Sequence, residues 1–155
     1  MRDSGLFAEV MEHALGSGTL VRFRAEGSSM HPTIRDGELI TVAPVSIADV
    51  ARGDLLLCRH RGRVLAHRIV SIAGDGRDRR FALRGDNQRA SDVFVGAGDI
   101  VARIVAVRRR GRSIALPGGW LRHRAGMTAA WTRRTIVQAI EACRSITVGA
   151  VRRRS

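Results

Sequence analysis

Hydrophobic residues between positions 20 and 116 occur in short runs that alternate with turn-forming residues. The runs are rich in β-branched residues, and Gly, Asp or Pro separates one run from the next. Such a pattern predicts short strands joined by tight turns, as in small β domains. The expected strands are Leu20–Ala25, Glu38–Ala43, Asp54–Arg59, Val64–Ala73, Arg80–Arg84, Ile100–Arg108 and Ser113–Leu116. We therefore expect a mainly β fold in which coiled antiparallel sheets form a small barrel-like core.

Four segments between these strands have the composition of tight turns. They are Asp36-Gly37, Gly53-Asp54, Gly74-Asp75-Gly76 and Gly85-Asp86-Asn87. Glycine adopts positive φ without strain, and Asp and Asn side chains accept hydrogen bonds from their own turns. The turn residues thus support the expected strand boundaries.

The pattern changes at both ends of the β region, which predicts three segments. Apolar residues recur at helical spacing before Gly16, so we expect a short amphipathic helix over residues 4–15 within an N-terminal segment, residues 1–19. Residues 20–116 form the β domain. Residues 117–155 begin with a Pro-Gly-Gly sequence and are rich in arginine, and we expect them to form a basic, helical tail.

The tail allows two interpretations. On a helix, Trp120, Met127 and Trp131 share one face, while arginines supply charge elsewhere. This face could lie on an anionic membrane surface as a peripheral contact. Alternatively, it packs against the edge of the β domain and the arginines are solvated. Both interpretations stay open from sequence alone.

The composition describes a basic, globular protein. The 155 residues are 45% hydrophobic and 26% charged, which suits one compact domain with an appendage. The formal net charge of +13 could attract nucleic acid, anionic lipid or an acidic partner, and charge alone does not choose among them.

Cys58 and Cys143 lie far apart, which favours free thiols. Cys58, His60 and His67 lack a fourth ligand, so we expect neither a metal nor another cofactor.

Hydropathy gives no sign of membrane insertion. No window reaches the roughly 18 apolar residues that a spanning helix needs. Asp3, Glu9 and Glu12 interrupt the continuous apolar core that a signal peptide requires. We therefore expect a cytoplasmic or peripherally membrane-associated protein.

Ser29 and His67 are the candidate nucleophile and base. A serine hydroxyl needs a neighbouring base to remove its proton, and Ser29 lies in a Gly-Ser-Ser turn closed by Pro32. None of the 27 basic residues is lysine, so a Ser-Lys mechanism is excluded and a histidine must be the base. With an ordinary pKa of about 6.5, His67 is mostly neutral at pH 7. Main-chain N–H groups beside Gly27 and Ser28 could form an oxyanion hole.

A carboxylate that orients the histidine would complete a triad. Such a group fixes the tautomer that leaves one ring nitrogen free to accept a proton. Asp86 and Asp92, six residues apart, are the candidates. Geometry rather than chain order decides whether the three groups act together.

Several motifs in series resemble the type I signal peptidase superfamily. They are Ser29-Met30 with Pro32-Thr33, then Gly53-Asp54, His67-Arg68-Ile69-Val70 and Gly85-Asp86-Asn87 followed by Asp92. The resemblance covers about residues 20–108. The histidine makes the chain most similar to the branch typified by endoplasmic-reticulum, archaeal and spore-former signal peptidases, because the usual bacterial enzyme has lysine there.

The resemblance implies roles for individual residues. Ser29 would be the nucleophile, His67 the base and Asp92 the third catalytic residue, with Asp86 as a structural residue of its turn. Substrate would bind in extended form beside the nucleophile, near Ser28, Met30 and Pro32. Gly27 stands where the family often has a hydroxyl residue that assists the oxyanion hole, so backbone donors would have to suffice.

The resemblance also has two departures. The family is normally anchored by a transmembrane helix, which this sequence does not predict. Self-cleaving repressors share the fold but use lysine and carry a DNA-binding domain ahead of it. About eighteen residues precede the β domain here, too few for such a domain.

The leading hypothesis is a serine endopeptidase that acts on a peptide or protein substrate through Ser29, His67 and Asp92. Two alternatives are a non-catalytic basic binding module, for nucleic acid, anionic lipid or a partner peptide, and a protease that cleaves itself or one dedicated partner. A binding module would leave the three site residues unexplained. Among its ligands, nucleic acid is the less favoured. The sequence does not predict an oligomeric state.

Overall fold

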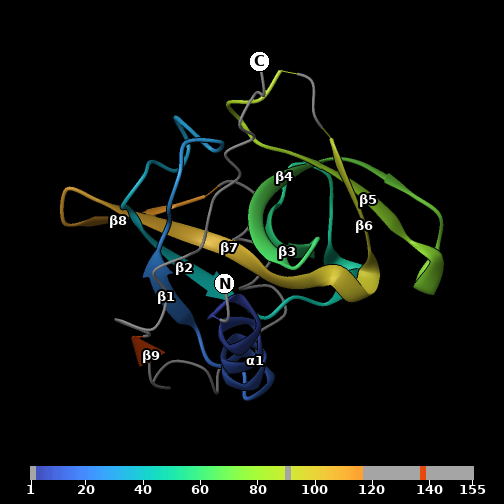
Figure 1. Ribbon diagram of the computed structural model, residues 1–155, viewed down its shortest axis with the longest axis horizontal. Helices are drawn as coiled ribbons and strands as arrows, with labels where there is room; N and C mark the ends of the chain where they lie inside the picture. Colours follow the sequence, from blue (N-terminus) through green and yellow to red (C-terminus); the bar gives the residue numbers. More distant parts are fainter. Residues whose placement is uncertain (1–2, 90–91, 117–136, 139–155) are drawn as a thin grey trace.

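One curled sheet with one helix packed against it makes up the described fold (Figure 1). The computed structural model describes residues 3–89, 92–116 and 137–138. The helix is α1 (Asp3–Gly16), and it packs against β1, β4 and β7. The strands are β1 (Val21–Arg24), β2 (Leu39–Ala43), β3 (Leu55–His60), β4 (Arg63–Ala73), β5 (Arg80–Arg84), β6 (Val93–Gly96), β7 (Ile100–Arg109), β8 (Arg112–Ala115) and β9 (Val137–Gln138). The expected mainly β fold with a short N-terminal helix is confirmed.

The sheet is antiparallel except at its last pairing. Its strand order is β6-β5-β4-β3-β7-β2-β1-β9. β8 lies off this path and pairs with the last residues of β7. Among these pairings, only that of β1 with β9 is parallel. The curl is strongest along β4, which arches beside β3 in Figure 1. Glycines with positive φ form the sharp turns between strands, among them Gly37 (φ 76) and Gly53 (φ 91).

Every strand expected from the sequence is present, with ends that differ by no more than one residue. β6 and β9 were not predicted. Three short 3-10 helices, η1 (Ile47–Asp49), η2 (Gly76–Asp78) and η3 (Ala97–Asp99), lie in connections between strands. The helical tail expected over residues 117–155 lies outside the described residues, apart from the two residues of β9.

Two apolar clusters hold the sheet together. The first combines Met11 and Leu15 of α1 with residues of β1, β2, β3, β4 and β7, and it also includes Met30 and Ile34 from the β1–β2 connection. The second lies among β3, β4, β5 and β6 and contains Leu56, Leu65, Ile69 and Phe81, among others. Side chains alternate along β4, so this strand contributes to both clusters. The buried apolar residues thus fix β4 and the β1–β2 connection, which carry the candidate base and nucleophile.

A buried ion pair lies where β3 meets β7. Arg103 Nη2 is 3.0 Å from Asp54 Oδ2, and both side chains are almost fully buried. Arg103 also donates to the carbonyl of Asp49 at 2.7 Å, and Asp54 accepts from the N–H of Ala51 at 3.0 Å. Leu56 is the Cα partner of both Arg103 and His67, so Arg103 and the candidate base lie on the same face of the sheet, one on each side of β3.

Candidate active site

Ser29 is held in a tight loop between β1 and β2. Gly27 has a φ of 93°, and its N–H donates to Asp36 Oδ1 at 2.7 Å. Met30 is fully buried in the first apolar cluster, and its carbonyl accepts from the N–H of Ile34 at 2.9 Å. These contacts fix the residues on both sides of Ser29, whose own side chain is buried with 3% exposure.

The backbone around Ser29 offers free donors. Within residues 3–89, 92–116 and 137–138, the N–H groups of Ser28, Ser29 and Met30 have no hydrogen-bond acceptor. The N–H of Gly27 is engaged by Asp36, and Pro32 has none to offer. Of the predicted oxyanion-hole residues, Ser28 and Met30 therefore keep an available backbone donor, and Ser29 adds its own.

His67 lies near the middle of β4, on the face of the strand that carries Leu65 and Ile69. Its side chain is buried, with 1% exposure. Burial lowers the pKa of His67 below its ordinary value of 6.5; Asp86 opposes the shift and His60 adds to it. A neutral ring at pH 7 is the form that a general base requires.

Ser29 and His67 are buried polar groups without partners in the described part of the chain. Neither Ser29 Oγ nor either ring nitrogen of His67 makes a hydrogen bond there, so no Ser29–His67 bond is present in this structure. An unpaired buried polar group destabilises the folded state by roughly 1–3 kcal/mol. Such groups are uncommon in proteins and concentrate where function requires them. Catalytic hydrogen bonds also often tighten only when substrate binds.

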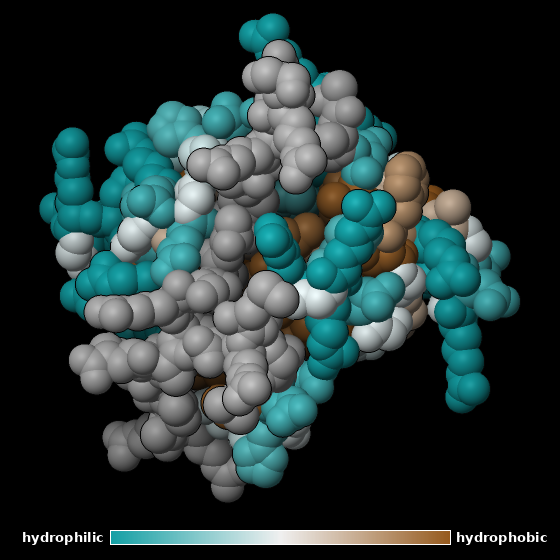
Figure 2. Space-filling model, in the orientation of Figure 1, coloured by the Kyte–Doolittle hydropathy of each residue, from teal (hydrophilic) through white to brown (hydrophobic). Residues whose placement is uncertain are grey.

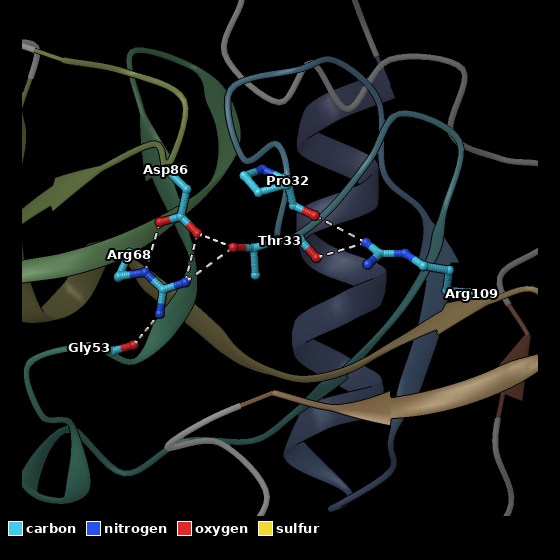
Figure 3. Close-up of polar contacts among 6 residues, drawn as sticks. All are labelled: Pro32, Thr33, Gly53, Arg68, Asp86 and Arg109. Atoms are coloured by element: carbon cyan, nitrogen blue, oxygen red, sulfur yellow. Dashed lines mark hydrogen bonds and ion pairs between the residues drawn. The ribbon is translucent and has the colours of Figure 1, made fainter.

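Arg68 connects three segments of the site (Figure 3). Its Nε and Nη2 donate to the two carboxylate oxygens of Asp86 at 2.7 and 2.6 Å, and its Nη1 donates to the carbonyl of Gly53 at 3.0 Å. Thr33 Oγ1 donates to the same carboxylate of Asp86. Burial acts to raise the pKa of Asp86, but the bonds from Arg68 and Thr33 outweigh it and lower that pKa. Asp86 is therefore ionised and joins the β4 strand to the loop that follows Ser29.

The Gly85-Asp86-Asn87 turn lies directly against the Ser29 loop. The N–H of Asn87 donates to the carbonyl of Ser29 at 2.7 Å, and Asn87 Nδ2 donates to the carbonyl of Ser28 at 3.1 Å. A Cβ atom at Gly85 would lie 2.6 Å from the carbonyl oxygen of Ser29, which is too close for any side chain. Glycine at this position is therefore required for the turn to approach the candidate nucleophile.

Asp92 has a different partner. Its two carboxylate oxygens accept from Arg84 Nε and Nη2 at 2.6 and 3.1 Å. The hydrogen bond from Arg84 lowers the pKa of Asp92. The groups that shift the pKa of His67 are its own burial, Asp86 and His60. Asp86, rather than Asp92, is thus the carboxylate that acts electrostatically on His67, and the catalytic role of Asp92 stays a prediction.

A second arginine supports the Ser29 loop from the opposite side. Arg109, at the end of β7, donates from Nη2 to the carbonyls of Pro32 and Thr33, each at 3.2 Å (Figure 3). The same guanidinium pairs with Glu38, with Nε 2.5 Å from Oε1. The hydrogen bond from Arg109 lowers the pKa of Glu38 despite partial burial.

The remaining reactive side chains have simpler surroundings. Burial raises the pKa of Cys58 to about 12, so its thiol is protonated and unreactive at neutral pH. His31 is exposed. Throughout the described residues, no group of three or more His, Cys, Asp or Glu side chains could hold a metal ion.

In the same ranges, no helix has the length and apolar content needed to cross a membrane.

Sequence reasoning found the segments of the site but missed the contacts that join them. Thr33, Arg68 and Asn87 were recognised only as parts of motifs, and the structure gives each a contact that positions the Ser29 loop. Glu38 and Arg109 were not singled out, because 71 positions separate them and no local pattern connects them.

Comparison with known proteins gives a family match. The family model described as Peptidase S24-like matches residues 8–107, which include most of α1, the Ser29 loop, β4 and the 85–87 turn. No curated protein matches the chain.

Proposed function

The chain belongs to the Peptidase S24-like family, and we propose that it hydrolyses a peptide bond with Ser29 as nucleophile and His67 as general base. Membership of this family supports a serine-peptidase type of hydrolase. The observation that carries the specific proposal is the pair of buried, unpartnered groups, Ser29 Oγ and the His67 ring, in the matched region. A serine and a neutral histidine supply the nucleophile and the proton acceptor that acyl transfer needs.

In this reaction, His67 removes the proton from Ser29 Oγ as that oxygen attacks the scissile carbonyl carbon. The tetrahedral oxyanion accepts hydrogen bonds from free N–H groups among Ser28, Ser29 and Met30. His67 then returns the proton to the leaving amine, and water hydrolyses the acyl-enzyme by the same proton transfers. Ser29 is 3% exposed, so a substrate must displace its neighbours to reach Oγ.

The histidine branch of signal peptidases is the finer assignment that we propose. His67-Arg68-Ile69 has histidine where that resemblance requires the base, and the chain has no lysine to replace it. In that branch Asp92 would orient the histidine. Asp86 raises the pKa of His67 electrostatically, which makes Asp86 a second candidate for this role, and separate substitutions distinguish the two.

Peptide digestion tests the proposed function. Purified protein is incubated with a library of unstructured peptides, and the products are identified by mass spectrometry. We expect defined cleavages that disappear in Ser29→Ala and in His67→Ala but persist in Ser71→Ala, which alters an exposed serine of β4. Products that are identical for the wild type and Ser29→Ala would refute the proposal.

Self-cleavage is the second candidate, because the family match fits it equally well. The intact masses of the wild-type chain and Ser29→Ala, compared after incubation without peptide, distinguish the two reactions. Loss of a defined fragment from the wild type alone would identify the chain as its own substrate.

A further inference from the structure

The hairpin between β7 and β8 carries a dense group of arginines. Arg108, Arg109, Arg110 and Arg112 surround Gly111 within five consecutive residues. The turn has positive φ at Arg110 (50°) and Gly111 (80°), and Arg108, Arg110 and Arg112 are exposed. Figure 2 shows hydrophilic side chains projecting from the left edge of the molecule, where Figure 1 places β8. We call residues 108–112 the arginine hairpin.

Most of this charge has no counter-ion among the residues that the structure describes. Arg109 pairs with Glu38, whereas Arg108, Arg110 and Arg112 form no ion pair or side-chain hydrogen bond with any residue that the structure describes. Among the described residues, one glutamate offsets one of the four arginines, which leaves three positive charges without a paired carboxylate. Arginines packed this closely repel one another, so an anionic ligand would relieve the repulsion.

The arginine hairpin lies beside the candidate catalytic loop. Arg109 donates to the carbonyls of Pro32 and Thr33, which follow Ser29 by three and four residues. Arg108 is the Cα partner of Leu39, which is in turn the partner of Arg24, so Arg24 and Arg108 lie on one face of the sheet. Arg35, also exposed, lies on the same loop.

From this arrangement we propose that the arginine hairpin binds carboxylates of an acidic segment in the polypeptide substrate. The inference rests on the proposed function, since it assigns a substrate class to the same site. Guanidinium groups bind carboxylates through two parallel hydrogen bonds, which gives geometric selectivity as well as attraction. Exposed charges of this kind also increase the association rate at low salt.

The composition of the hairpin favours an acidic peptide over a membrane. Residues 108–112 contain no apolar side chain, whereas segments that bind membranes in the interface carry large apolar residues for insertion. The position of the hairpin favours a peptide over nucleic acid, because its anchor, Arg109, holds the loop proposed to attack a peptide bond. Binding to a membrane or to nucleic acid is measured as an alternative outcome of the same experiment.

Binding is measured on Ser29→Ala, so that the result does not depend on hydrolysis. The probes are a dye-labelled extended peptide with a run of glutamates and the same peptide with glutamines. We expect the glutamate peptide to bind more tightly, and added salt to abolish the difference. Replacing Arg108, Arg110 and Arg112 together with glutamine should weaken binding of the glutamate peptide about tenfold, given a fraction of a kcal/mol for each exposed charge.

Two controls separate a docking surface from general charge or misfolding. Arg52, Arg63 and Arg77, also exposed and without partners among the described residues, are replaced with glutamine to remove the same charge elsewhere; binding of the glutamate peptide should then change less than twofold. Replacing the three hairpin arginines with glutamate should instead make a lysine peptide the better ligand.

Three results would overturn the inference. The first is equal affinity of Ser29→Ala for the glutamate and glutamine peptides. The second is equal loss of binding in the hairpin and control variants. The third is a hairpin-dependent preference for phosphatidylglycerol vesicles or a single-stranded oligonucleotide without discrimination between the peptides. If the wild type cleaves no peptide while hairpin-dependent binding persists, the proposed function fails and the anion-binding surface remains.

Discussion

Arg68, the residue that follows the candidate base, donates two hydrogen bonds to the carboxylate of Asp86, at 2.7 and 2.6 Å. Through Thr33 and the adjoining Asn87, this pair ties β4 to both sides of the Ser29 loop. The relative position of Ser29 and His67 therefore depends on an ion pair between two residues that need not take part in proton transfer.

Arg68→Lys should disrupt that positioning, because an ammonium group cannot make the two parallel bonds to Asp86. We expect a loss of about 1–3 kcal/mol in the free energy of unfolding, measured by urea titration. kcat/KM should fall by about tenfold or more, since small misplacements of reacting groups slow catalysis strongly. Arg59→Lys is the matched control, since Arg59 pairs with Glu12 at an exposed site. Equal effects of the two substitutions would argue against a positioning role for Arg68.

The pH dependence should report the low pKa of His67. As the pH falls below the ordinary value of 6.5, the unfolded chain binds a proton that the folded protein still excludes. The free energy of unfolding should therefore decrease below pH 6.5 and level off below the folded pKa, and kcat/KM should fall as the pH passes through that pKa. His67→Gln should remove this part of the stability profile; an unchanged profile would show that burial does not depress the pKa.

Asp86 and Asp92 should affect the titration of His67 differently. Asp86 raises the pKa of His67, so Asp86→Asn should lower it further. Because Asp92 pairs with Arg84, Asp92→Asn should leave the midpoint unchanged in an NMR titration of the imidazole protons. A lowered midpoint in Asp92→Asn would instead favour the triad that the family resemblance predicts.

Replacing Ser29 should stabilise the fold while it abolishes activity. The buried hydroxyl of Ser29 has no partner among the described residues, so Ser29→Ala should raise the free energy of unfolding by up to about 1 kcal/mol. Ser71→Ala, at an exposed position, should change stability by less than about 0.5 kcal/mol. Clear destabilisation by Ser29→Ala would mean that the hydroxyl has a structural partner.

The buried pair of Arg103 and Asp54 should be among the most sensitive positions of the β domain. Asp54→Ala leaves Arg103 charged and buried, which should lower the free energy of unfolding by about 3–5 kcal/mol. The exposed Asp75 provides the control, and Asp75→Ala should have little effect. Urea titrations with unchanged m-values would attribute the loss to the native state, and similar losses in the two variants would contradict the structure.

The sequence predicted those parts of the fold that local patterns specify. Alternation and turn residues located β1 to β5, β7 and β8, because each expected strand is a run of β-favouring residues beside a Gly or Asp turn. β6 was not predicted, because its place in the sheet depends on pairing with β5, which no local pattern reveals. The network that joins Thr33, Arg68 and Asp86 spans 53 positions, so no periodicity within a single element could reveal it.

Covalent labelling of Ser29 tests most directly whether Ser29 is a nucleophile activated by His67. The protein is treated with a serine-directed organophosphorus probe across a range of pH, and the modified residue is identified by peptide mapping with mass spectrometry. We predict modification of Ser29 that increases as His67 loses its proton, is suppressed in His67→Ala, and persists in the control Ser71→Ala. Labelling that continues at the same rate in Ser29→Ala, or a folded wild type that is never modified at Ser29, would contradict this prediction.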